Sequence, residues 1–386
     1  MARLSALGSL TLLCISSLTI MVGSIVAPAL PSIALHLGMT DYASLLITLP
    51  SLGVVIFAPF AGRLIDKYGA YHCTSLALFL YGALGISGQW LYGPEMVFIN
   101  RILLGAVTAL TMAGSTTLIS QFYFGHKRLV MMAKQGMAVE LGGVVFLFAA
   151  GLLAINSWNQ PFLLYALAWV FLGMMLLLVP NKYPSDPDAA NRQSTTATQV
   201  SLRPIFITSC IAMTLFFSGF VVLPITMKHS GYTEDKIGFF LAFVSLMAVI
   251  TAHFLPKIYT RCQDKGTLSI AFGFYALSHC AYYFGETASI LILGGIFSGV
   301  GFGLSIPLLN HMTVEKSAPS NRGKNLSYFA MAVFLGQFLT SFIELLPGNI
   351  RSVFAVVAIV AVLYLIYIQT CFKRQPNETV ELDSLT

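Results

Sequence analysis

Apolar runs separated by short polar segments recur along the whole sequence. A helix of about 20 apolar residues crosses a hydrocarbon core of roughly 30 Å. A transmembrane β-strand would instead alternate apolar and polar residues over about ten positions, whereas these runs are continuously apolar. The pattern therefore predicts an all-α membrane protein with twelve spans, at residues 7–35, 42–61, 73–92, 95–122, 130–154, 162–180, 204–227, 237–256, 267–285, 288–312, 326–346 and 350–371.

Two polar segments divide the predicted spans. Residues 181–203 are rich in Asp, Asn, Ser, Thr and Pro, which predicts a solvated cytoplasmic linker between six-helix bundles at 1–180 and 204–373. Residues 374–386 are polar and predict a disordered cytoplasmic tail. The first apolar run is too long for the core of a signal peptide, so we expect it to remain as the first span.

The basic residues are distributed unevenly over the connecting segments. Of the 21 Lys and Arg residues, only Lys228, Lys236 and Arg351 fall on the segments that lie outside when the N-terminus is inside, and Arg101 lies within a span. Cytoplasmic loops carry an excess of basic residues. This bias predicts that both termini are cytoplasmic.

Composition supports a chain solvated by lipid. Charged residues make up 9% of the chain and apolar residues 57%, with a mean hydropathy of +0.81. A soluble domain carries roughly a quarter charged residues. The net charge of +6 comes from residues placed singly or in pairs between spans, which argues against nucleic-acid binding. The six cysteines lack the spacing of metal ligands, so we expect neither a metal site nor a disulfide framework.

An internal repeat relates the two halves. Leu30-Pro31 is followed by Gly38 and Thr40, and Leu223-Pro224 is followed at the same spacing by Gly231 and Thr233. The segments at 101–107 and 295–301 match at almost the same offset. Duplicated bundles of this kind occur in transporters whose substrate site lies between the repeats near mid-membrane.

The segment Gly62-Arg-Leu-Ile-Asp66-Lys67-Tyr-Gly69 resembles the G-x-L-x-D-[RK]-x-G loop motif of the major facilitator superfamily. Residues 28–38, Asn100-Arg101 with Gly105, and residues 319–324 also resemble the twelve-helix drug:proton antiporters of that family. The resemblance covers nearly the whole chain and implies two pseudo-symmetric six-helix bundles.

The loop motif has a physical interpretation as a conformational switch. Gly62 and Gly69 permit a tight reversal, and Lys67 adds a basic residue. The resemblance implies that Asp66 engages the positive end of the eleventh span, near Asn325, in one state of the transport cycle. The alternative is an ordinary solvated loop. The basic pair that follows the motif in the family is replaced by Ala and Tyr at 70–71, which predicts a weaker charge network.

The fifth span departs from the antiporter pattern. The family's Gly-Pro is replaced by Phe146-Leu147, although glycines that permit close helix packing remain at 142, 143 and 151. This departure keeps uptake open as an alternative to export.

Two charges within spans are candidate coupling residues. Arg101 lies roughly 9 Å from the outer end of its span and Glu140 roughly 15 Å from the inner end of the next. We hypothesise that they interact and that Glu140 carries the coupling proton, because burial favours its neutral form and a nearby arginine its ionised form. The alternatives are a permanent ion pair, or Arg101 as a substrate anchor that favours a neutral or anionic substrate.

Further candidates follow from the helices that line the cavity in the resembled fold, which are the first, fourth, seventh and tenth. The cavity residues predicted from these helices are Ser17, Thr108, Thr111, Ser218 and Asn310. Gln337 of the eleventh span is a further predicted cavity residue, with some of the phenylalanines at 216, 217, 220, 297, 302, 334 and 338. His253, His279, His311 and Glu344 are weaker candidates.

The sequence contains no phosphate-binding loop, nucleophile constellation or metal cluster, so we expect neither an enzyme nor an ATP-driven pump. The first hypothesis is proton-coupled efflux of a drug-like compound or an exported metabolite such as a siderophore. Proton-coupled uptake of a small metabolite is the second, and a non-transporting membrane sensor or scaffold the third. We expect a monomer in the plasma membrane (the inner membrane of a Gram-negative cell) that uses the proton gradient and no cofactor. Its expected partners are membrane lipids and a small-molecule substrate.

Overall fold

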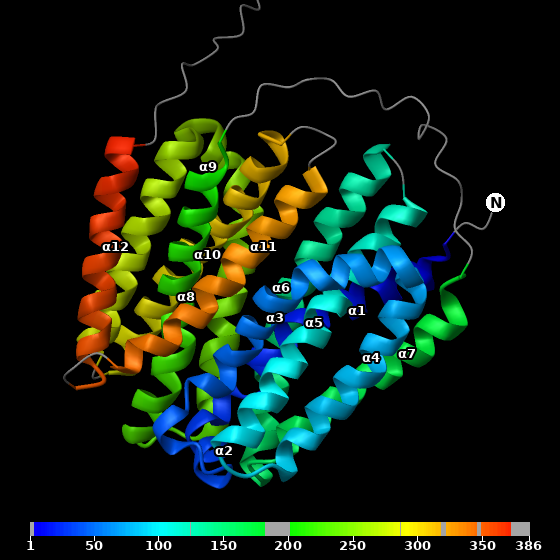
Figure 1. Cartoon of the computed structure of the whole chain (residues 1–386). Helices are drawn as coiled ribbons and strands as arrows, with labels where there is room; N and C mark the ends of the chain where they lie inside the picture. The colour runs from blue at the N-terminus through cyan, green and yellow to red at the C-terminus, as the bar shows by residue number, and fades with distance from the viewer. Residues whose placement is uncertain are drawn as a thin grey trace, which may run out of the picture.

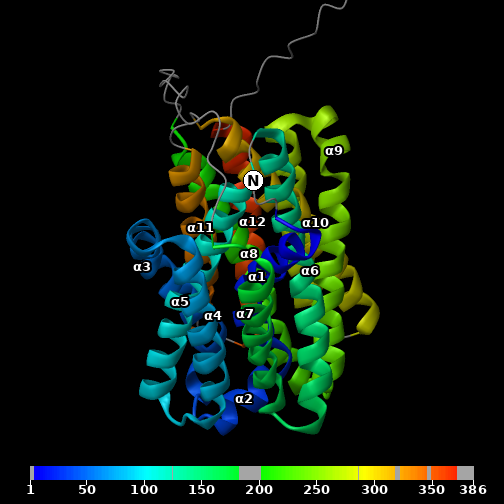
Figure 2. The same cartoon turned by 90° about the vertical axis from the view of Figure 1, so that its right-hand side faces the viewer.

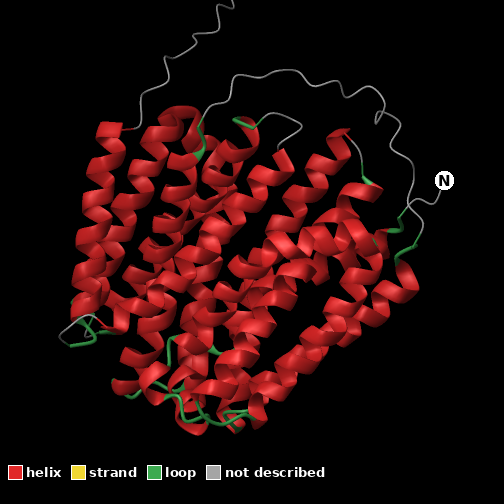
Figure 3. Cartoon of the chain, in the orientation of Figure 1, coloured by secondary structure: helices red, strands yellow, loops and turns green. Residues whose placement is uncertain are grey.

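The computed structural model describes residues 4–123, 125–181, 201–285, 287–317, 322–345 and 349–371. Every regular element within these residues is helical, as Figure 3 shows, with the loops gathered at the two ends of the molecule. Most of the predicted linker and all of the predicted tail lie outside the described residues.

Within the described residues, the first half forms seven α-helices and four 3₁₀ turns. In chain order they are α1 (Ala6–Ser24), η1 (Ala27–Ala29), α2 (Leu30–His36), η2 (Thr40–Tyr42), α3 (Leu45–Tyr68), α4 (Ala70–Ser87), η3 (Gly88–Trp90), α5 (Pro94–Phe122), α6 (Gly125–Asn156), η4 (Gln160–Ala166) and α7 (Leu167–Leu178).

The second half forms longer helices. In chain order they are α8 (Arg203–His229), α9 (Glu234–Tyr283), α10 (Ala288–Glu315), α11 (Arg322–Leu339), η6 (Thr340–Leu345) and α12 (Ser352–Cys371).

The helices account for the twelve predicted spans. Within the described residues, ten helices are long and apolar enough to cross a membrane. The 50-residue α9 contains two predicted spans, separated by the non-helical backbone of Gln263 at φ 54° and ψ −174°. The 18-residue α4 is not among the ten, since His72, Thr74 and Ser75 lower its hydropathy. The prediction of a polytopic all-helical membrane fold is confirmed.

The two halves lie side by side, with α1–α7 on one side and α8–α12 on the other in Figure 1. The start of α1 and the end of α12 lie at the same end of the molecule, called the terminus face below, and α2 lies at the other end, the opposite face. In the turned view of Figure 2, α1 lies within the first half, and it packs against α5, α6 and α7.

The internal repeat forms the same kind of turn twice, once after α2 and once after α8. Gly38 and Gly231 both have positive φ, at 68° and 85°, a region that glycine enters without steric penalty. In each turn the next amide bonds the carbonyl oxygen five residues earlier, at 2.7 Å from Met39 and 3.0 Å from Tyr232. This is the hydrogen-bond pattern that closes helix C-termini. The repeated sequence therefore ends α2 and α8 in the same way at the opposite face.

Helices in the first half approach closely where glycines meet backbone. A Cβ added to Gly105 of α5 would lie 2.0 Å from the carbonyl oxygen of Pro50 of α3. A Cβ added to Gly53 of α3 would lie 2.3 Å from the carbonyl oxygen of Ile102. Small residues at such contacts drive helix association in lipid, where the hydrophobic effect between helices is absent.

We expect Gly105→Ala to destabilise the folded protein by about 1–3 kcal/mol, because the added methyl group must push α3 and α5 apart. Gly173→Ala in α7 is the matched control, since a Cβ there meets nothing within 4 Å. Thermal unfolding of both purified variants in detergent measures the effect. Equal melting temperatures for the two variants would show that the α3–α5 contact tolerates a side chain.

Candidate transport cavity

A cavity lies between the two halves and holds about 550 Å³ of unfilled space, including the part open to solvent. Both halves contribute to its wall, and so do helices from several parts of the sequence. The lining residues are Thr19, Ile20, Val22, Gly23, Ser24, Ile47, Ser51, Glu140 and Leu147 from the first half and Met213, Phe216, Phe217, Phe220, Ser245, Phe302 and Gln337 from the second.

The second half lines the cavity with aromatic rings. Phe216 and Phe217 are neighbours on α8, Phe220 follows about one turn later, and all three line the same space as Phe302 of α10. The ring centroids of Phe216 and Phe302 are 4.2 Å apart, and Phe217 and Phe220 are stacked at 5.7 Å. These four rings form a continuous aromatic wall. Of the seven phenylalanines considered as candidates, these four line the cavity.

The first half supplies the one carboxyl group among the lining residues. Glu140 of α6 is half-buried and faces the cavity together with Leu147, two turns further along the helix. Glycines place α6 beside α1, since a Cβ on Gly142 would lie 2.7 Å from the Cβ of Ser17. The glycine packing predicted for the fifth span is therefore present.

Arg101 lies within the first half and does not line the cavity. Its side chain is fully buried, with Nη1 3.5 Å from the hydroxyl oxygen of Tyr165 and the guanidinium carbon 5.3 Å from the ring centre of Phe162. Among the described residues its Nε and Nη2 atoms have no hydrogen-bond partner.

The hypothesised ion pair between Arg101 and Glu140 is therefore not formed in this conformation. Arg101 lies about two turns from the start of α5, whereas Glu140 lies near the middle of α6, and their side chains contact different neighbours. Depth along a span does not specify the direction of a side chain around the helix axis. The coupling roles of both residues stay predictions.

The predicted cavity residues are only partly brought together. Gln337 lines the cavity. Ser17, Thr108 and Thr111 are buried against other helices, and each donates to a carbonyl oxygen of its own helix three or four residues earlier.

The two remaining predicted cavity residues, Ser218 and Asn310, lie in the second half. Ser218 is fully buried, donates to the carbonyl oxygen of Leu215 and lies 3.4 Å from Nε2 of His279. Asn310 is exposed near the end of α10 at the terminus face. Apart from Gln337, the polar candidates came from four helices, whereas α3, α6, α9 and α11 also line the cavity and α5 does not.

The switch motif lies at the terminus face. Gly69 has φ 84° at the turn between α3 and α4, as a tight reversal requires, but Gly62 lies inside α3 and takes no part in the turn. Asp66 and Lys67 are exposed, and the Lys67 ammonium lies 5.1 Å from the ring centre of Tyr68. Within the described residues Asp66 forms no hydrogen bond or ion pair. The predicted contact with α11 is not made in this conformation.

The histidine candidates differ in their surroundings. His253 and His311 are exposed, and His311 lies 3.5 Å from Glu315. His279 is buried, with Nε2 2.8 Å from the carbonyl oxygen of Leu215. The side chain of Glu344 lies outside the described ones.

Two polar contacts join the halves between α3 and the segment formed by α11 and η6, called the α3–α11 seam below. Ser51 Oγ donates to Oε1 of Gln337 at 2.7 Å, and both residues line the cavity. Thr48 and Ser341, about one turn closer to the opposite face, share a hydrogen bond of 2.5 Å. The seam between α3 and α11 is therefore closed by hydroxyl and amide groups.

The contact between α6 and α9 is apolar. A Cβ on Gly238 would lie 2.7 Å from the Cα of Gly151, and the rings of Phe148 and Phe239 stack at 5.0 Å. These residues lie in the last turns of α6 and the first turns of α9, on the opposite-face side. With the α3–α11 seam they close the opposite face, while the switch motif at the terminus face is exposed.

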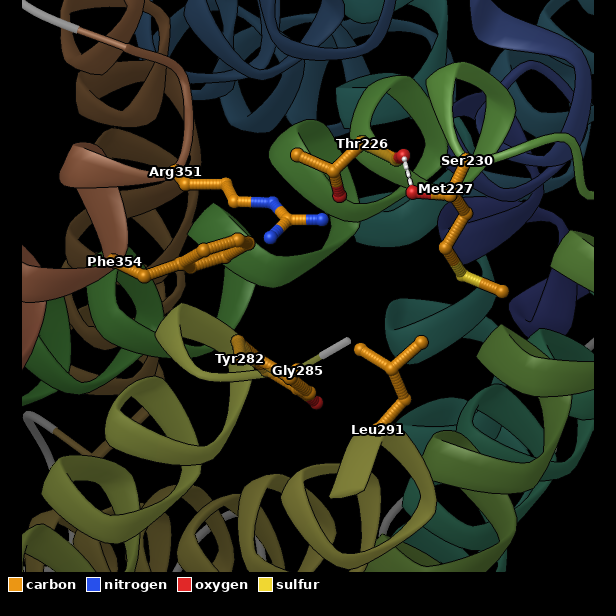
Figure 4. Close-up of a pocket in the computed structure, with 8 residues that line it drawn as sticks. All are labelled: Thr226, Met227, Ser230, Tyr282, Gly285, Leu291, Arg351 and Phe354. Atoms are coloured by element: carbon orange, nitrogen blue, oxygen red, sulfur yellow. Dashed lines mark hydrogen bonds between the residues drawn. The ribbon is translucent and has the colours of Figure 1, made fainter. Parts of the chain in front are cut away.

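A second hollow, of about 260 Å³, lies in the second half at the ends of α8, α9, α10 and α12 (Figure 4). Figure 4 shows the Arg351 guanidinium directed toward Thr226, above Tyr282 and Leu291. Only residues of the second half line it, so it does not lie between the halves. Within the described residues no cluster of His, Cys, Asp and Glu could hold a metal ion.

We expect Ser245→Cys to react readily with a water-soluble maleimide, because Ser245 lines the cavity. Ser218→Cys is a matched control with the same small change, at a position that is fully buried and directed toward His279. Labelling rates of the purified variants, in a background whose native cysteines are replaced, compare the two positions. Faster labelling at position 218 would contradict the orientation of α8 described above.

The sequence is similar to those of known membrane transporters. The family model of the Major Facilitator Superfamily matches residues 12–341 and again 237–385. The Bacillibactin exporter of Bacillus subtilis is 24% identical over 81% of this chain and 83% of its own length. The Quinolone resistance protein NorA of Staphylococcus aureus is 26% identical over 56% of this chain and 55% of its own.

Solved transporters share the fold at low sequence identity. The nucleoside transporter NupG aligns with a TM-score of 0.73 over 96% of this chain and 100% of its own, at 16% identity. A D-xylose-proton symporter aligns with a TM-score of 0.74 over 95% and 98%, at 17% identity. The family match, the two helical halves and the cavity between them agree, and the chain belongs to the Major Facilitator Superfamily of membrane-spanning secondary transporters.

Proposed function

We propose that this transporter exports an amphipathic organic molecule across the plasma membrane in exchange for protons, and that Glu140 is the residue that exchanges the proton. The observation that carries the proposal is the position of Glu140. It is the one carboxyl group among the residues that line the cavity, and a wall of four phenylalanines lines the same space.

The wall suits a substrate with an aromatic or apolar body. Aromatic rings bury large apolar surfaces and also attract cations to their faces. A basic group on the substrate would compete with a proton for Glu140, which is the competition that antiport requires. Arg101 within a span predicted a neutral or anionic substrate, but its side chain is buried away from the cavity. We therefore propose a neutral or cationic amphipathic substrate.

The proposed direction of transport is supported by the distribution of the basic residues and by the closure of the opposite face. Their distribution favours the terminus face as the cytoplasmic one. The seams that join the halves lie toward the opposite face, so this conformation suits loading from the cytoplasm. The names of the Bacillibactin exporter and the Quinolone resistance protein NorA also favour export.

The energy source and the partners complete the proposal. The proton gradient drives transport without a cofactor, and a monomer surrounded by lipid carries one substrate molecule. Drug-like compounds and siderophores are the first classes to test. A non-transporting sensor would not need a carboxyl group within a cavity between two mobile halves.

Transport by reconstituted protein tests the proposal. The purified chain is placed in liposomes with a pH gradient, and norfloxacin, ethidium and bacillibactin are offered as probes. Proton movement that depends on a probe, measured with a pH-sensitive dye, is the expected result. Probe and proton moving in the same direction would instead show uptake by symport, and transport without dependence on the gradient would overturn antiport.

We expect Glu140→Gln to abolish gradient-driven transport of the probe, because the amide cannot take up or release a proton. Exchange of labelled probe at equal pH should persist, since the cavity and its aromatic wall remain. Glu95→Gln is the matched control, because Glu95 is exposed in the first turn of α5. Normal gradient-driven transport by Glu140→Gln would contradict the assignment.

A further inference from the structure

Three side chains link the halves at the opposite face, outside the cavity. They are Ser32 of α2, Lys228 near the end of α8 and Glu234 in the first turn of α9. We infer that these three residues form a latch that holds the opposite face closed, and that its release accompanies opening of the cavity to that face. The inference depends on two-sided transport but not on the proposed proton, direction or substrate.

The latch converges on one carboxylate oxygen. Ser32 Oγ donates to Glu234 Oε1 at 2.7 Å, and Lys228 Nζ pairs with the same oxygen. The Glu234 side chain is 16% exposed and that of Lys228 is 37% exposed. Hydrogen bonds to an ionised group are stronger than neutral ones, and partial burial reduces screening by salt. The bond from Ser32 crosses between the halves, while Lys228 fixes the carboxylate within the second half.

The surrounding backbone holds the carboxylate in place. Glu234 lies in the first turn of a long helix, where the unpaired amides favour a negative charge. A Cβ on Gly151 of α6 would lie 3.2 Å from the carbonyl oxygen of Glu234, so the first half packs directly against this turn. The other charged residues of the same turn are Asp235 and Lys236. The hydrogen bond that Ser32 donates goes to Glu234 rather than to either of them.

The internal repeat shows which residues the turn requires and which the latch requires. With an offset of 193, the Leu-Pro, His, Gly and Thr positions that build the turn are the same in both halves. All three latch positions differ, since Ser32 corresponds to Ile225, Lys228 to Leu35 and Glu234 to Asp41, which keeps only the carboxylate. The latch therefore uses positions at which the two copies have diverged, and the shared turn does not account for it.

Each latch residue lies on a helix that lines the cavity or shortly after one in the sequence. α2 follows α1, which carries Ser24, while α8 carries Phe220 and α9 carries Ser245. A path from the cavity to the opposite face must separate α2 from α8 and α9. Such a separation breaks the bond between Ser32 and Glu234. Closure and the latch are thus mechanically coupled.

Accessibility of a cavity cysteine tests the latch without a substrate. Ser245→Cys is introduced into a background without native cysteines, and labelling by a membrane-impermeant maleimide is followed from each face separately. Intact cells and inverted vesicles present the two faces, and a tag at the chain end identifies the terminus face. Ser32→Ala, which removes one oxygen, and Glu234→Ala are compared with the unmodified latch.

We expect Ser32→Ala to raise the labelling rate from the opposite face about tenfold, as the loss of one hydrogen bond to a charged group implies. Glu234→Ala should raise it at least as much. Labelling from the terminus face should not rise. Matched controls are Ser230→Ala, whose hydroxyl donates to a carbonyl oxygen of α8, and Asp235→Ala in the same turn as Glu234. Both controls should label at the unmodified rate.

Three results would overturn the latch. An unchanged rate in Ser32→Ala would show that its bond does not hold the face closed. An equal rise in the controls would show a general effect of the turn or its charge. A rise from both faces would indicate loosening of the fold rather than a shift between closed and open states. Should Glu234→Ala fail to fold, Ser32→Ala alone decides.

Discussion

The hydrocarbon core of a membrane offers no hydrogen-bond partner, and much of this structure follows from that constraint. Short hydroxyl side chains within the spans donate to carbonyl oxygens of their own helices, as Thr111 does to Val107 and Ser218 to Leu215. A hydroxyl satisfied in this way packs like a small apolar residue. Most of the serines and threonines therefore serve packing, and the cavity takes its polar groups from only a few of them.

The same solvent removes the hydrophobic attraction between helices, so close packing must take its place. Glycines provide that packing within the first half, where Gly105 meets the backbone of Pro50. They provide it between the halves as well, where Gly151 meets Gly238. Contacts within a half and contacts that close the opposite face thus have similar chemistry. The closed face differs in adding polar groups that can exchange partners with water when the halves separate.

The cavity is asymmetric although the architecture is duplicated. Its carboxyl group comes from α6 of the first half, and its aromatic wall comes from α8 and α10 of the second. A molecule that contacts both walls therefore bridges the halves. Because Ser51 and Gln337 belong both to the wall and to the α3–α11 seam, an occupant of the cavity also adjoins the contacts that close the opposite face.

The sequence alone determined that lipid surrounds this protein and how many spans it has, because length and hydropathy decide both locally. Matching residues at a fixed offset also revealed the repeat. The sequence also located Glu140 and Gln337 and indicated a use for Gly69, whose positive φ the turn requires. It did not determine which way each side chain faces. An error of one residue in a helix turns a side chain by about 100°, since 3.6 residues make one turn.

Only the tertiary structure decided that Arg101 lies inside the first half and Glu140 in the cavity. Residue depth is a one-dimensional property, whereas a pairing depends on how several helices rotate and tilt against one another. The meeting of Ser32 with Glu234, 202 positions away, was likewise beyond the sequence pattern. Contacts between the halves depend on the conformation of the transporter. The amino-acid pattern of one span does not specify which helix of the other half it will contact.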